Sequence, residues 1–143
     1  MNENLIDWVR CGVVLAGVGQ LILVFASAVI PRCLGWKKSL VHIPLILRQQ
    51  FWAYAGYILG MHLFFGLFSV FGTDLLLDGS AQAALFCGMI MIWWMVRVGL
   101  QFLYFDRAGI PATKFNLIAE MLLVALFVFL SIVYAAALFV NLR

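Results

Sequence analysis

The sequence predicts an all-α fold, a four-helix transmembrane bundle that forms a single integral membrane domain over residues 1–143. Of its residues, 66% are hydrophobic and only 10% are charged, whereas a soluble domain carries about 25% charged residues. Spanning the hydrocarbon core takes roughly 20 mainly apolar residues per helix. Four runs meet this requirement, and because they lack strict alternation we expect helices instead of barrel strands. The runs cover about 11–30, 50–72, 81–105 and 116–140.

The first run contains a small-x-small triplet at 26–28, which is typical of a signal-peptide cleavage site. A signal peptide begins with a basic segment, but here Glu3 and Asp7 accompany Arg10. We therefore expect a true first transmembrane helix.

Lysine and arginine gather on one predicted side of the membrane. The first and third connections between the runs hold six of them, while the opposite side has Arg10 and Arg143, with Asp74 and Asp78 in its loop. The positive-inside rule predicts both termini on the non-cytoplasmic side. The six basic residues are Arg32, Lys37, Lys38, Arg48, Arg107 and Lys114.

The formal net charge of +3 reflects the orientation of the chain in the membrane and contact of its basic residues with anionic lipid head groups. No nucleic acid partner is expected, because no basic patch with interleaved aromatic residues lies outside the runs. The expected partners are membrane lipids and either further copies in a homo-oligomer or a larger membrane complex. The expected location is the cytoplasmic membrane of a bacterium.

Two features distinguish the second apolar run and the segment that precedes it. Residues 39–47 are apolar but too short to span, and Pro44 interrupts them, so they should lie in the interface or enter the helix obliquely. Gly56 and Gly60 form a G-x-x-x-G pair, which permits close contact between helices.

Histidine and cysteine are too scattered to predict a metal or haem site. His62 lies near the middle of the second run and His42 at another depth, so no bis-histidine haem is expected. We expect His62 to be a packing residue that hydrogen-bonds Gln20. No disulfide or thiolate metal site is predicted from the three cysteines, which lack paired spacing: Cys11, Cys33 and Cys87.

The third run contains an arginine inside the predicted membrane. Arg97 lies nine residues before Asp106, and Glu120 lies nine residues after Pro111, which places both about 13 Å from the same membrane face. The connection between the two runs is short, so these helices should be antiparallel neighbours. We expect Arg97 and Glu120 to meet.

Polar residues follow one stripe of each of these helices at a period of 3.6 residues. One interpretation is a buried ion pair that fixes the register of the helices. The other is a polar pocket in the cytoplasmic half, in which Arg97 binds an anionic group, Tyr104 donates a hydrogen bond and Arg48 lies at the entrance. The predicted ligand-binding residues are Arg97, Gln101, Tyr104, Asn116, Glu120 and Arg48.

Arg97, Tyr104 and Pro111, followed by Lys114, resemble the end of the third helix in the MAPEG family, membrane-associated proteins in eicosanoid and glutathione metabolism. The resemblance implies a four-helix fold, termini away from the cytoplasm and a trimer. It also implies that Arg97 stabilises a thiolate and that Tyr104 hydrogen-bonds beside it, as candidate catalytic residues.

The family's second helix carries an asparagine and a glutamate that bind glutathione, and 48–57 of this chain contains neither. The sequence therefore leaves open whether the protein is an enzyme. It favours a MAPEG-like binder of an anionic or thiol-bearing amphiphile. The alternatives are a non-catalytic subunit of a larger membrane complex and, with less support, a transporter.

Overall fold

The computed structural model describes residues 3–33, 35–105 and 113–143. Across these residues the fold is all-α, and four of its helices are long and apolar enough to cross a membrane. This confirms the predicted fold class. The elements are α1 Glu3–Cys33, α2 Trp36–Ser39, the short 3-10 helix η1 Leu40–His42, α3 Leu45–Phe71, α4 Thr73–Leu76, α5 Ala81–Leu103 and α6 Lys114–Asn141.

The first helix is longer than the apolar run that predicts it. It contains 31 residues, which corresponds to a length of about 46 Å, whereas the hydrocarbon core is roughly 30 Å thick. Hydropathy marks only the part suited to lipid, so it does not predict where the helix itself begins. The helix therefore continues beyond the apolar run toward Glu3.

The connection between α1 and α3 contains two short helices. Gly35 precedes α2 with a φ of 63°, in the left-handed region that favours glycine. Pro44 is the N-cap of α3, where its missing N–H removes no helical hydrogen bond. The predicted interruption at Pro44 is thus the start of α3, and this helix begins before the apolar run at residue 50.

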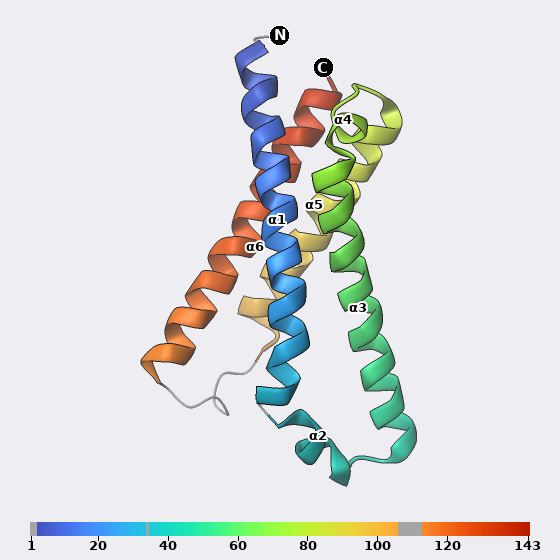
Figure 1. Ribbon diagram of the computed structural model, residues 1–143, viewed down its shortest axis with the longest axis vertical. Coiled ribbons are helices and arrows are strands. Elements are labelled where there is room, and N and C mark those ends of the chain that lie inside the picture. Colours follow the sequence, from blue (N-terminus) through green and yellow to red (C-terminus); the bar gives the residue numbers. More distant parts are fainter. Residues whose placement is uncertain (1–2, 34, 106–112) are drawn as a thin grey trace.

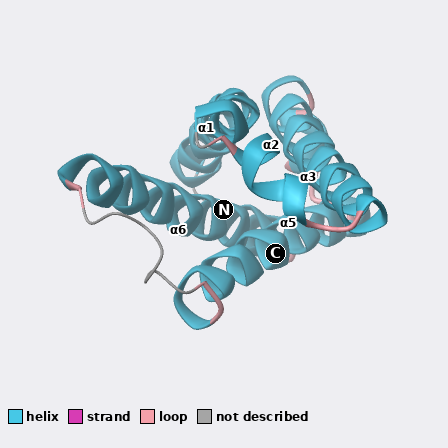
Figure 2. Cartoon of the chain, turned by 90° about the horizontal axis from the view of Figure 1, so that it is seen from below, coloured by secondary structure: helices cyan, strands magenta, loops and turns pink. Residues whose placement is uncertain are grey.

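The helices pack closely at one end of the molecule and diverge at the other (Figure 1). The packed end contains both termini and α4, and the spread end contains α2. Helix α1 lies against α3 and α6, while α5 pairs with α6. Seen along the bundle, the first turns of α6 extend away from the other helices (Figure 2).

Two glycines set the close approach of α1 and α3. A Cβ added to Gly17 would lie 3.0 Å from the backbone oxygen of Gly66 and 2.8 Å from Val70 Cγ2. In contrast, a Cβ added to Gly56 or Gly60 would meet nothing within 4 Å. The close contact within the chain therefore lies at Gly17 and Gly66, and the G-x-x-x-G pair is left on an open face of α3.

A hydroxyl in the core joins three helices. The Tyr134 side chain on α6 is fully buried. Gln20 Nε2 on α1 donates to its Oη at 2.6 Å, and Ser69 Oγ on α3 lies 2.5 Å from the same atom. The predicted bond between Gln20 and His62 is wrong, because the Gln20 amide donates to Tyr134 instead.

Side-chain bonds also fasten the packed end. Asn141 Nδ2 donates to the carbonyl of Leu76 at 2.7 Å, and its Oδ1 accepts from the Gly79 N–H at 3.0 Å. Arg10 forms a salt bridge with Asp74 across the surface of α1 and α4. These contacts hold the segment between α3 and α5 against α1 and the end of α6.

Candidate functional site

Arg97 lies in the last two turns of α5, toward the spread end of the bundle, and is half-buried. Its guanidinium carbon is 5.0 Å from the ring centroid of Phe127 on α6 and 5.2 Å from that of Phe105. Its Nη1 atom is buried and has no hydrogen-bond partner among the described residues. The rings stabilise the cation but offer its N–H group no acceptor.

The structure does not pair Arg97 with Glu120. The recorded salt bridge of the described residues joins Arg10 to Asp74, and Glu120 Oε1 instead accepts a hydrogen bond from Gln101 Nε2 at 3.1 Å. Gln101 therefore lies level with Glu120, while Arg97 lies one turn farther from the spread end. The predicted meeting of Arg97 and Glu120 is wrong because it relied on depths counted along the chain, which ignore the lean of α6.

His62 lies in the same cluster as Arg97. Trp93 Nε1 on α5 donates to His62 Nε2 on α3 at 3.2 Å. An imidazole nitrogen that accepts carries no proton, so the neutral ring has its proton on Nδ1. That atom is buried and has no partner among the described residues. His62 is a packing histidine, as predicted, but it also presents a second, unused donor.

A continuous stack of planar groups connects His62 to Arg97. The His62 ring stacks on Trp94 with centroids 4.9 Å apart, and Trp94 stacks on Phe127 at 5.4 Å. Arg97 then covers the Phe127 ring. The Trp94 indole Nε1 is buried and also lacks a partner in the described part of the chain.

Three N–H groups of this stack are thus buried without an acceptor among the described residues. They are His62 Nδ1, Trp94 Nε1 and Arg97 Nη1, which come from α3 and α5. All three are donors, and one carries a positive charge. Leaving a buried donor unsatisfied costs roughly 1–3 kcal/mol. Each of them could donate a hydrogen bond to a group that only accepts, such as an oxyanion.

The other predicted site residues lie around this cluster or apart from it. Tyr104 ends α5 and is 75% exposed, with its ring packed edge to face on Phe105. The backbone N–H of Asn116 donates to Thr113 Oγ1 at the start of α6. Arg48 lines a separate cavity with Lys37 and Trp52. Arg97 alone of the predicted set belongs to the stack.

Sequence reasoning missed Trp94 and Phe127. Both look like ordinary apolar core residues, and both are almost completely buried. The available signal was the spacing of Trp94 and Arg97, which lie three residues apart and therefore share a face of the helix. Phe127 offered no comparable signal.

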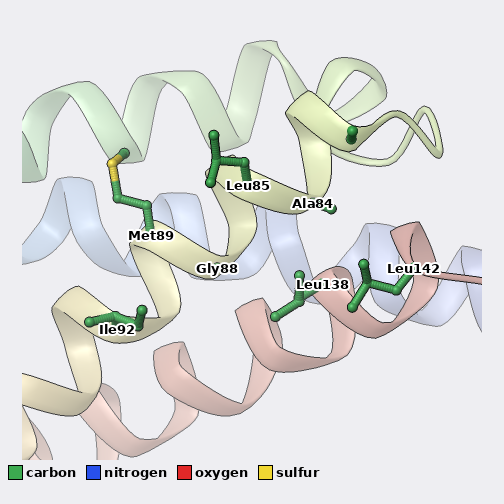
Figure 3. A pocket seen from close by; sticks show the side chains of 8 residues that line it. Ala84, Leu85, Gly88, Met89, Ile92, Leu138 and Leu142 are labelled. Carbon is green, nitrogen blue, oxygen red and sulfur yellow. The ribbon is translucent and has the colours of Figure 1, made fainter.

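A second cavity, of about 570 Å³, lies between α5 and α6 near the packed end (Figure 3). Its lining side chains are all apolar, so it offers a ligand no charge or hydrogen bond. The residues are Ala81, Ala84, Leu85, Gly88, Met89, Ile92, Leu138 and Leu142.

Among residues 3–33, 35–105 and 113–143, no three His, Cys, Asp or Glu side chains gather in a way that could hold a metal ion. No family model, curated protein or solved structure matches the chain. A function must therefore be inferred from the side chains around Arg97.

Proposed function

We propose that this protein binds an anionic or thiol-bearing amphiphile within the membrane, with the anionic head group, a carboxylate, phosphate or thiolate, beside Arg97. The three unsatisfied donors of the stack carry this proposal. Arg97 supplies the opposite charge, and Trp94 and His62 supply directed hydrogen bonds.

The energetics of a membrane support the assignment. An arginine inside a spanning helix is costly to insert and normally faces a partner or a cavity. Here the guanidinium is covered by two aromatic rings and forms no ion pair with the nearby carboxylate of Glu120. An anionic head group would supply the missing charge.

The shape of the bundle supports access to this site. Helix α6 diverges from its neighbours toward the spread end, where α5 also ends (Figure 1). An amphiphile could enter there from the lipid, with its chain along the exposed apolar surface and its head toward Arg97. The positive-inside rule assigns this end to the cytoplasmic leaflet.

The resemblance to the MAPEG family adds support through Arg97, since an arginine at that place would stabilise a thiolate. Tyr104 packs on Phe105, whose ring centroid lies 5.2 Å from the Arg97 guanidinium carbon, and Pro111 lies outside the described residues. Glutathione is therefore one ligand to test among several.

A second candidate function is assembly through the outer face of α3, as a homo-oligomer or as a subunit of a larger complex. Gly56 and Gly60 are open on this face, and such pairs let the backbones of two membrane helices approach closely. This candidate is compatible with the first.

The test is ligand-induced thermal stabilisation of the full chain in mild detergent. The probes are dodecyl phosphate, oleate and glutathione, with dodecylphosphocholine as a zwitterionic control. We expect an anionic amphiphile to raise the Tm of the parent protein by several degrees and to raise that of Arg97→Leu by much less.

Arg143→Leu is the matched control, because Arg143 also covers a phenylalanine ring, with its Cζ 4.1 Å from the Phe139 centroid, but lies at the other end of α6. It should keep the full response. An equal response in Arg97→Leu and the parent protein would refute the binding site.

A further inference from the structure

A second cationic site lies at the start of α3, apart from the Arg97 stack. Lys37 from α2, together with Arg48 and Trp52 from α3, lines a cavity of about 260 Å³. Arg48 and Trp52 are four residues apart, so they share one face of the helix. Lys37 reaches the cavity from the preceding connection.

Aromatic contacts hold α2 in the position that forms this cavity. The rings of Trp36 and Phe51 pack edge to face with centroids 5.6 Å apart. Phe51 packs in the same way against Trp52 at 5.5 Å. The residue before Lys37 is thereby fixed to the helix that carries Arg48, which brings two positive charges to one cavity.

Neither of these two charges is paired with an acidic residue in the described part of the chain. No aspartate or glutamate occurs between Asp7 and Asp74, and the recorded salt bridge of the described residues involves neither Lys37 nor Arg48. In the described part of the chain neither side chain is engaged in a salt bridge, so both can donate to an external anion.

The surface beside the cavity combines exposed apolar side chains with the cations. Val41, Leu45 and Ile46 are 60%, 59% and 61% exposed, immediately before Arg48 in the sequence. Exposed apolar residues beside cations and a tryptophan are typical of the boundary between the acyl chains and the head groups.

We propose that Lys37, Arg48 and Trp52 bind the phosphate group of an anionic phospholipid at the membrane face that carries α2. The planar guanidinium of Arg48 can donate two parallel hydrogen bonds to phosphate oxygens, and Lys37 acts as a point charge. Trp52 packs beside the glycerol region. The cavity is smaller than the roughly 300–1,000 Å³ of pockets for drug-sized ligands, so it takes a head group while the acyl chains remain in the bilayer.

Short-chain lipids test this site directly. The full chain in mild detergent is titrated with dihexanoyl phosphatidylglycerol, dihexanoyl phosphatidylcholine or inorganic phosphate, and its Tm is measured. We expect phosphatidylglycerol to raise the Tm by several degrees and the other two probes to have little effect. Equal stabilisation by inorganic phosphate would assign the site to free phosphate and overturn the lipid proposal.

Matched variants separate this cavity from general attraction of anions to a basic surface. Lys37→Gln with Arg48→Gln should abolish the response to phosphatidylglycerol. Arg32→Gln with Lys38→Gln removes the same charge from the same end of the bundle without changing a residue that lines the cavity, and should keep the response. Equal loss in both double variants would overturn the proposal.

Arg97→Leu separates the two sites. It should retain the response to phosphatidylglycerol while losing the response to dodecyl phosphate at the intramembrane site. A phosphatidylglycerol response that disappears in Arg97→Leu and survives in Lys37→Gln with Arg48→Gln would place the lipid at the stack, against this inference.

Discussion

Arg97 faces Phe127 across the α5 and α6 pair, with its guanidinium carbon 5.0 Å from the centre of the ring. This contact stands in place of the ion pair between Arg97 and Glu120, which was predicted because the two residues lie at equal depths along their helices. It determines how the membrane-embedded charge responds to mutation.

Arg97→Leu and Glu120→Gln should affect stability independently. Cation–π contacts contribute roughly 0.5–2 kcal/mol, and an unsatisfied buried donor costs roughly 1–3 kcal/mol. Losing both in Arg97→Leu should therefore change the free energy of unfolding by between about 1 kcal/mol of destabilisation and about 2.5 kcal/mol of stabilisation. A double-mutant cycle measured by unfolding in detergent should give a coupling energy below about 0.5 kcal/mol. Coupling above that level would show that the two charges pair.

Tyr134→Phe should destabilise the protein. Removal of the hydroxyl takes the shared partner from Gln20 and Ser69. Gln20 Nε2 keeps its bond to the Ala16 carbonyl at 3.3 Å, whereas the Ser69 hydroxyl loses this partner, at a cost of roughly 1–3 kcal/mol for an unsatisfied buried group. Tyr57→Phe is the control, because Tyr57 is 75% exposed. The Tm of the two variants should differ by several degrees, and similar values would show that the hydroxyl contributes little.

Gly17→Ala should destabilise the bundle, whereas Gly56→Ala should not. The new methyl group at Gly17 would lie 3.0 Å from a backbone oxygen that cannot move aside without shifting α3, and overpacking of this kind costs roughly 1–3 kcal/mol. At Gly56 the space is open, and alanine favours the helix by about 1 kcal/mol. Thermal unfolding of both variants checks the sign at each position.

Gly60→Leu should weaken assembly in mild detergent. A leucine on the open face of α3 separates the backbones of associating helices but meets nothing within its own chain at the Cβ position. Light scattering after size-exclusion chromatography should show a smaller assembly, with Gly99→Leu on α5 as the control at a second open glycine. If both variants keep the parent mass, the contact surface is not this face.

Cysteine labelling should distinguish the two ends of the bundle. With the native cysteines replaced by serine, Trp36→Cys should react only with a reagent admitted to the cytoplasm. Leu75→Cys, at a position 61% exposed near the packed end, should react from outside intact cells. The reverse pattern would invert the proposed orientation and place the Arg97 site in the other leaflet.

Hydropathy was sufficient to predict the four long helices of this fold, although not their exact ends, because each must satisfy its backbone within a span of lipid. It also identified Arg97 as the exceptional residue of α5. The partners of Arg97 could not be predicted, because counting residues from a common end treats neighbouring helices as parallel cylinders. The divergence of α6 shifts the register, so that Gln101 meets Glu120 while Arg97 meets Phe127.

The roles of the aromatic residues around Arg97 could not be predicted from the sequence. Trp94 and Phe127 count as apolar in any hydropathy profile, whether they face lipid or stack beneath a guanidinium. Only the direction of the ring planes distinguishes these roles, and that direction depends on neighbours far away in the chain. The positions of Gly17 and Gly66 were hidden for the same reason, since their close approach involves two different helices.

The Tyr134 hydroxyl has a consequence for the order in which the chain is built. Membrane helices first insert individually and then associate, and here α1 with α3 and α5 with α6 form two antiparallel hairpins. Tyr134 belongs to the second hairpin, while Gln20 and Ser69 belong to the first. Its hydrogen bonds therefore form only when the hairpins come together, so this one oxygen acts at the docking step and plays no part in insertion.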